Sequence, residues 1–152
     1  ERLFRERLLS TLLRTAPFFS PLAEVERRRL LKRFSARHVQ AGEVIVQEGA
    51  RAGGFFLIVL GTVEISRMTG AKSTRLATLS DASYFGEMSL LKDAQAGASV
   101  IAATTVELAE LSPKDFYEVV SANPTLWQEL RVEARRRELA NQNIVAGDTA
   151  IV

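Results

Sequence analysis

The sequence predicts an α+β fold in which helices precede and follow a roll of short β-strands. Three observations predict it: helical apolar spacing at the start, short β-branched runs between glycines in the middle, and two cap-plus-proline signals near the end. The chain has 152 residues and is 47% hydrophobic, which suits a domain with a real core. We expect one domain, 1–152, with helices in 1–35, a β-roll in 36–111, helices in 112–141 and a tail in 142–152.

Two helices are expected before the roll. An apolar stripe at helical spacing predicts the first, over residues 3–15; it consists of Phe4, Leu8, Leu9, Leu12 and Leu13. The segment 16–19 interrupts that pattern. Ser20 as N-cap and Pro21 at the first helical position then predict a second helix that ends near Phe34.

Residues 36–111 contain short apolar runs separated by turns that contain glycine. The runs are 44–46, 55–60, 63–65, 76–79, 100–102 and 106–111, and the last alternates with period two. Strands this short and evenly spaced favour a sandwich, a barrel or a jelly roll. Gly42, Gly49 and Gly61 are expected to make the tight turns.

Helices are expected again after the roll. Ser112 and Pro113 form an N-cap with proline at the first position, and Asp115 places an acid in the first turn. Asn123 and Pro124 repeat the cap-plus-proline pattern, so the last helix is expected to run from Pro124 to about Asn141.

Composition excludes several classes of protein. The absence of Cys excludes disulfides, thiol catalysis and Cys-based zinc sites, and it favours a cytoplasmic location. No apolar run is long enough to span a bilayer, and the charged start does not resemble a signal peptide. The chain begins without Met, which suggests an excerpt of a longer protein. His38 is the only His and is expected at a surface or strand edge. With no catalytic constellation, no metal site and no cofactor motif in view, we expect a protein that is not an enzyme.

Charge is uneven along the chain although the net charge is only +2. Residues 1–40 carry ten Arg or Lys against four acids, and residues 41–120 carry six against ten. A basic front can indicate nucleic acid or a lipid surface, but solvated helix faces explain it more simply. No helix-turn-helix follows, so nucleic-acid binding is not supported and no membrane contact is expected in this fragment.

The segment Tyr84–Leu91 carries the main functional signal. Gly86 and Glu87 stand at the start of a short predicted helical turn. The open end of a helix offers unpaired N–H groups to a phosphate, whereas a carboxylate there suits a sugar hydroxyl. This pairing predicts a site for a ribose phosphate; the alternative is that Glu87 merely caps the turn.

Residues 17–120 resemble the cyclic-nucleotide-binding domain family, which includes the catabolite activator protein, regulatory subunits of cAMP-dependent protein kinase and gating domains of ion channels. The resemblance lies in Ala41–Ile45, Glu48–Gly49, the hairpin Phe55–Glu64, the segment Phe85–Leu91 and Ala98–Val100. It implies an eight-stranded jelly-roll-like β-roll flanked by helices, with 84–100 as a phosphate-binding cassette.

The resemblance also implies a ligand site for cAMP or cGMP. Its expected members are Phe85, Gly86, Glu87, Met88, Ser89, Ala98 and Ser99. Glu87 would accept a hydrogen bond from the ribose 2′-hydroxyl, and backbone N–H groups around Met88 would face the cyclic phosphate. Gly86 would let the backbone approach the ligand closely.

One position departs from the family pattern. The family's phosphate-binding Arg follows its Glu by about nine residues, where this chain has Ala96. Loss of such a charge-assisted contact would cost about 2–4 kcal/mol of binding free energy. Ser99 keeps a hydroxyl there, and Lys92, Arg51 and Arg75 are the nearby cations in sequence, although nothing in the sequence places them in the pocket.

Three functions therefore stay open: a weakened cyclic-nucleotide sensor, a site for another small molecule, or a degenerate domain kept for structure or dimerisation. In the sensor, ligand binding would move the last helix allosterically and a larger parent protein would read the change. Trp127, Arg131 or Arg135 could then cover the base, although core packing explains Trp127 more simply. Arg135–Arg137 is expected to be a solvated helix end, and an apolar stripe on 3–15 or 124–141 could support a homodimer.

Overall fold

A computed structural model describes residues 2–15, 19, 21–51, 53–92 and 94–142, and within them the expected order of elements is confirmed. Helices α1 (Arg2–Thr15) and α2 (Glu24–Arg33) come first, and α4 (Pro113–Ala122) and α5 (Pro124–Gln142) come last. Between them lie eight strands and the short helix α3 (Glu87–Lys92). The expected α+β class and the eight strands are thus both found.

The strands form two antiparallel sheets of four. One has the order β1-β8-β3-β6, and its strands are β1 (Ser35–Val39), β8 (Val106–Leu111), β3 (Phe55–Leu60) and β6 (Tyr84–Phe85). The other has the order β2-β7-β4-β5, and its strands are β2 (Val44–Val46), β7 (Ser99–Ala102), β4 (Val63–Thr69) and β5 (Lys72–Leu79). First and last strands pair, as do β2 and β7, which gives the jelly-roll-like winding expected from the sequence.

Two hydrophobic clusters meet on strand β3, which is buried along most of its length. Its odd-numbered residues Phe55, Leu57 and Val59 belong to the cluster under the helices. Phe56 and Ile58 join the cluster between the two sheets. Side chains alternate across a strand, so one apolar run supplies both clusters and holds the helices against the roll.

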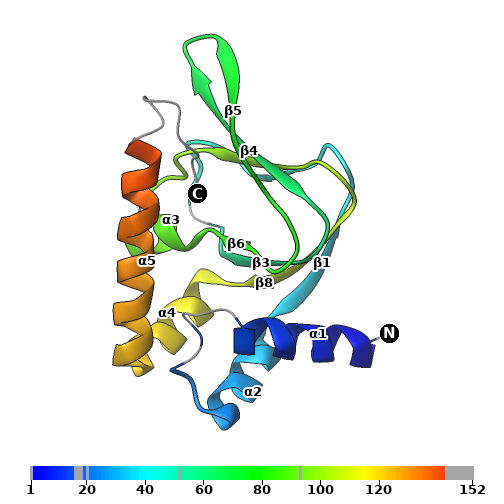
Figure 1. The fold of residues 1–152 in the computed structure, drawn as a ribbon, viewed down its shortest axis with the longest axis vertical. Helices are drawn as coiled ribbons and strands as arrows, with labels where there is room; N and C mark the ends of the chain where they lie inside the picture. Colours follow the sequence, from blue (N-terminus) through cyan, green and yellow to red (C-terminus); the bar gives the residue numbers. More distant parts are fainter. Residues whose placement is uncertain (1, 16–18, 20, 52, 93, 143–152) are drawn as a thin grey trace.

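The helices lie along one flank of the roll and across one end, and this arrangement places the candidate site (Figure 1). Helix α5 runs alongside the roll with α3 between it and strand β6, while α1 and α2 lie at one end. The β4–β5 hairpin extends at the opposite end. The segment that begins at Tyr84 is therefore enclosed between a sheet and α5.

The predicted start of the second helix is wrong. Helix α2 begins at Glu24, because Leu22 is buried and its N–H donates to the carbonyl of Phe19 in a separate turn. The first-turn carboxylate of Glu26 accepts from the N–H of Ala23 at 3.3 Å, so an acid satisfies this helix end. Ser20 lies outside the described residues.

The C-terminal helices start where the sequence predicts. The hydroxyl of Ser112 accepts from the N–H of Asp115 at 3.2 Å and caps α4. Helix α5 begins at Pro124, but the side chain of Asn123 donates to the carbonyl of Val119 in α4 at 2.8 Å. Asn123 thus ends one helix with its side chain rather than capping the next. None of the helices, over the residues described, is long and apolar enough to cross a membrane.

Candidate functional site

Backbone geometry at Gly86 fixes the position of the candidate site. Gly86 has φ +99°, and a Cβ there would lie 2.4 Å from the carbonyl oxygen of Gly54 and 3.3 Å from the ring of Phe56. An L side chain would be strained and would collide with backbone. The close approach that glycine permits here is therefore to β3 and the residue before it, and it directs the next residue, Glu87, under α5.

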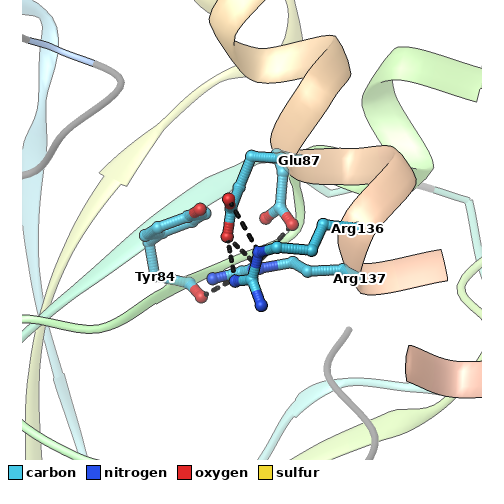
Figure 2. Close-up of polar contacts among 5 residues, drawn as sticks. Tyr84, Glu87, Arg136 and Arg137 are labelled. Atoms are coloured by element: carbon cyan, nitrogen blue, oxygen red, sulfur yellow. Dashed lines mark hydrogen bonds and ion pairs between the residues drawn. The ribbon is translucent and has the colours of Figure 1, made fainter. Parts of the chain in front are cut away.

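Glu87 forms a buried ion pair with Arg137, a residue of α5 (Figure 2). The Glu87 side chain has no exposed surface, and its Oε1 lies 2.6 Å from the Arg137 guanidinium. Arg137 also donates to the carbonyl of Tyr84 at 3.3 Å, and its guanidinium carbon lies 3.8 Å from the centre of the Tyr84 ring. One arginine thus connects the end of α5 to both β6 and α3.

The second carboxylate oxygen of Glu87 has a different environment. Among the described residues Oε2 has no hydrogen-bond partner, although it is buried. Burial raises the pKa of Glu87 to about 7, and the charge of Arg137 opposes that rise. When it is ionised, Glu87 presents at Oε2 an acceptor that a hydroxyl donor could satisfy.

Two further residues of α5 complete the charged cluster. Glu133 lies 3.6 Å from Arg137 Nε and pairs closely with Arg136, whose guanidinium lowers the pKa of the Glu133 carboxyl. Burial raises the pKa of the neighbouring Tyr84 phenol. We name Glu87, Glu133, Arg136 and Arg137 the α5 charge cluster; it holds two carboxylates and two guanidiniums.

The expectation that Arg135–Arg137 is a solvated helix end is wrong for Arg137. Its side chain is only 6% exposed, whereas Arg135 and Arg136 are exposed. The burial of Arg137 could have been predicted from the sequence, because Arg137 continues the apolar stripe that Leu126, Leu130 and Ala134 form on α5. A charge on an apolar stripe needs a buried partner, and Glu87 provides it.

The other predicted residues of β6 and α3 are buried or half-buried. Phe85 is fully buried and stacks on Phe56, with ring centres 4.9 Å apart, in the cluster between the sheets. Met88 is half-buried. Ser89 is buried, and its carbonyl accepts from the N–H of Ala94.

The predicted residues at the end of the cassette are joined to the segment before β3. Ala96 and Ala98 are buried. The carbonyl of Ala96 accepts from the N–H of Gly49, and the N–H of Ala96 donates to the carbonyl of Ala50, each at 2.8 Å. The Ser99 hydroxyl accepts from the N–H of Glu48 at 2.9 Å and from the Gln47 amide at 3.4 Å.

Of the three cations named as possible replacements for the missing Arg, two are paired with carboxylates and the third lies beside the cassette segment. Lys92 pairs with Glu138 at 2.7 Å, and Arg75 pairs with Glu64 at 3.3 Å on the β4–β5 hairpin. Arg51 is exposed and its backbone bridges to Gln95. Among the described contacts, the cation at Glu87 is Arg137.

Trp127 and His38 behave as packing and surface residues. Trp127 is half-buried against the cluster under the helices, and Arg131 lies 6.0 Å from its ring centre. Trp127 and Arg131 line a groove between α3 and α5 that is also lined by Leu91, Lys92 and Arg135. His38 is half-exposed on β1 and pairs with Glu107 of β8, in agreement with the expected strand-edge role.

Comparison with known proteins identifies the family. The family model for the cyclic nucleotide-binding domain matches residues 36–123. The chain belongs to the cyclic nucleotide-binding domain family. The relatives found include regulatory subunits of cAMP-dependent protein kinase, a catabolite activator protein and a cyclic nucleotide-gated potassium channel.

Three relatives illustrate the match. The cAMP-dependent protein kinase regulatory subunit of Yarrowia lipolytica is 29% identical over 116 residues, which cover 76% of this chain and 30% of that protein. The Thermus thermophilus catabolite activator protein superposes with a TM-score of 0.74 at 29% identity, over 86% of this chain and 62% of that one. The regulatory subunit of a cAMP-independent protein kinase A from Trypanosoma cruzi, bound to guanosine, superposes with a TM-score of 0.76 at 22% identity. The match covers 99% of this chain and 53% of that one.

The chain spans about a third of the length of the curated relatives that it matches. The matched residues 36–123 correspond to one cyclic nucleotide-binding domain.

Proposed function

We propose that this domain is a regulatory ligand-binding module whose ligand contacts Glu87 through a ribose hydroxyl. The observation that carries the proposal is the buried, unpartnered Oε2 of Glu87 beside the Glu87–Arg137 ion pair. The family supports cAMP and cGMP as the first candidates. Guanosine, the ligand of the Trypanosoma cruzi subunit, shares the ribose and lacks the phosphate, so ribose is the group common to these candidates.

Access to Glu87 would couple the ligand to α5. Because the Glu87 side chain has no exposed surface, a ligand reaches it when Arg137 and the end of α5 shift. The ligand then binds the shifted state more tightly than the closed one, and this difference in affinity drives the equilibrium. Helix α5 is thus the element whose position the rest of a larger parent protein would read.

Affinity for a cyclic nucleotide is expected to be weak. Ala96 offers a methyl group where the family pattern has a guanidinium, and the Glu87–Arg137 pair must be opened before the ligand binds. A weak ligand shifts a two-state equilibrium only slightly unless it is abundant. The proposal therefore concerns a sensor of reduced sensitivity to cAMP and cGMP, with Phe85, Gly86, Met88, Ser89, Ala98 and Ser99 shaping its cassette.

Calorimetric titration with cAMP and cGMP, followed in parallel by Trp127 fluorescence, tests this function. Trp127 is the only Trp and lies on α5, so its emission reports movement of that helix. We expect binding heat and a change in emission that Glu87→Ala abolishes and that the surface variant Glu64→Gln retains. Failure of both nucleotides and their nucleosides to bind at millimolar concentration would contradict the sensor.

A structural or dimerisation module is the second candidate function. The complete burial of Glu87 favours it, because a closed ion pair can hold α5 in place without a ligand. Exposed Val132 and Leu139, seven residues apart on α5, would supply an apolar strip for a homodimer. Sedimentation that shows a stable dimer, together with no ligand binding, would support this candidate over the sensor.

A further inference from the structure

Above about pH 7, where Glu87 is ionised, the charges around it balance one another. The α5 charge cluster has two carboxylates and two guanidiniums, and its ion pairs are Glu87–Arg137, Glu133–Arg136 and Glu133–Arg137. Both guanidiniums thus already face carboxylates. Every ligand must shift Arg137 to reach Glu87, but an anionic ligand also needs a guanidinium of its own and would keep it from its carboxylate, whereas a neutral ligand lets the ion pairs form again around it.

The described part of the cassette segment 84–100 supplies no spare cation. Its positive side chain there is Lys92, which pairs with Glu138 on α5 and lines the groove beside Trp127. Lys92 is 45% exposed, while Glu87 is fully buried. The ammonium group therefore faces a different surface from the carboxylate that would bind the ribose.

Three backbone N–H donors around the end of the segment are also occupied. The N–H of Ala96 donates to the carbonyl of Ala50, and the N–H groups of Gly49 and Glu48 donate to Ala96 and Ser99. A phosphate needs several such donors to replace the water that it loses. Here the donors of Glu48, Gly49 and Ala96 are instead used in hydrogen bonds between the two chain segments.

Helix α3 adds little for an anion. It has six residues, and its first residue is Glu87, so a carboxylate already stands at its N-terminal end. The unpartnered Oε2 is an acceptor, which matches a sugar hydroxyl and repels a phosphate.

We infer that this site selects an uncharged ribonucleoside over the corresponding cyclic nucleotide. The inference rests on the proposed function, because it concerns the ligand of the same Glu87 site. A nucleoside keeps the hydroxyl that donates to Oε2 and brings no charge against the balanced cluster. We expect adenosine or guanosine to bind about tenfold or more tightly than cAMP or cGMP, as one lost charge-assisted contact would give.

Titrations of the whole 152-residue chain with adenosine, guanosine, cAMP and cGMP test the selectivity directly. 2′-Deoxyadenosine serves as a probe for the hydroxyl and should bind more weakly than adenosine. Ala96→Arg introduces a cation at the buried end of the segment, and Ala94→Arg places the same charge on an exposed residue of the same loop. Ala96→Arg should strengthen cAMP binding about tenfold and leave adenosine unchanged, while Ala94→Arg should change neither.

The wild-type ranking decides the outcome even if Ala96→Arg does not fold. Tighter binding of a nucleoside than of its cyclic nucleotide supports the inference. Equal or tighter binding of the cyclic nucleotide overturns the inference and leaves the proposed sensor intact. If none of the four ligands binds at millimolar concentration to folded protein, the proposed function fails and the inference fails with it.

Discussion

Gly86 shows how one residue without a side chain positions a charged neighbour. Its positive φ and its contact with Gly54 turn the chain out of β6 and bring Glu87 beneath α5. The pattern Gly-Glu in the sequence suggested a ligand approach at the glycine. In the structure the glycine is required by packing, and the carboxylate after it carries the candidate chemistry.

Gly86→Ala is expected to lower the free energy of unfolding by about 2 kcal/mol or more, because it adds both a strained φ and a backbone collision. Gly97→Ala is the matched control in the same segment, since a Cβ there meets nothing within 4 Å. It should change stability by about 0.5 kcal/mol or less. Urea denaturation of both variants measures the difference, and equal effects would contradict the assigned role of Gly86.

The raised pKa of Glu87 predicts a pH-dependent stability. The folded protein keeps the Glu87 proton up to about pH 7, whereas the unfolded chain loses it near the ordinary value of 4.5. The contribution is therefore fully present below pH 4.5 and is lost as the pH rises through 7. Compared with Glu87→Gln, the wild type should lose about 1–3 kcal/mol of stability between pH 5 and 8.

Urea denaturation at several pH values gives this difference. Arg137, Tyr84 and Glu133 face Glu87 in both proteins, so the comparison isolates the Glu87 carboxyl. The surface variant Glu64→Gln should follow the wild type throughout the range. Parallel stability curves for the wild type and Glu87→Gln would show that Glu87 titrates near its ordinary value.

Helix α5 is attached to the roll by two kinds of contact. Its apolar stripe, which includes Leu126 and Leu130, packs into the cluster under the helices. Near its other end Arg137 contacts Glu87 and Tyr84. The apolar contacts hold the first turns, so a ligand that competes for Glu87 would release the last turns while the helix stays attached.

At pH 8, where Glu87 is ionised, Arg137→Ala should destabilise the protein by about 3–5 kcal/mol, because it leaves a buried carboxylate without its cation. Arg136→Ala is the adjacent control; Arg136 is 62% exposed, and its loss should cost about 1 kcal/mol or less. Thermal unfolding compares the two. The double variant Glu87→Gln with Arg137→Met should recover much of the loss, since it removes both charges. A loss no larger than that of Arg136→Ala would contradict a buried pair.

The sequence predicted elements better than their charged contacts, and the reason is physical. Period-two alternation and capping residues act locally, so β8, α4 and the start of α5 could be predicted. The pattern Ser20–Pro21 predicted the wrong helix start, because the burial of Leu22 is a tertiary effect and α2 begins only at Glu24. The Glu87–Arg137 pair joins residues 50 positions apart, and only the stripe on α5 hinted at it.

At the scale of the whole molecule, strand β3 joins the two hydrophobic clusters. Phe55 packs with Phe19 and Phe116 on the helix side, with ring centres 6.0 and 5.7 Å apart. Phe56 stacks on Phe85 between the sheets. Neither cluster can lose this strand without exposing the other, so the roll and the helices should unfold together.

Phe56→Ala tests this coupling between the clusters. Removing a buried aromatic ring should cost about 3–5 kcal/mol, although Phe56 lies on the face of β3 away from the helices. Trp127 packs against the helix-side cluster, so its fluorescence follows the other half of the molecule. We expect the thermal midpoint from Trp127 fluorescence to fall together with the midpoint from far-ultraviolet circular dichroism. Arg75→Ala, on the exposed hairpin, should move neither midpoint. If the fluorescence midpoint stays in place while the dichroism midpoint falls, the helices and the roll are separate folding units, and α5 could not report on events inside the sheets.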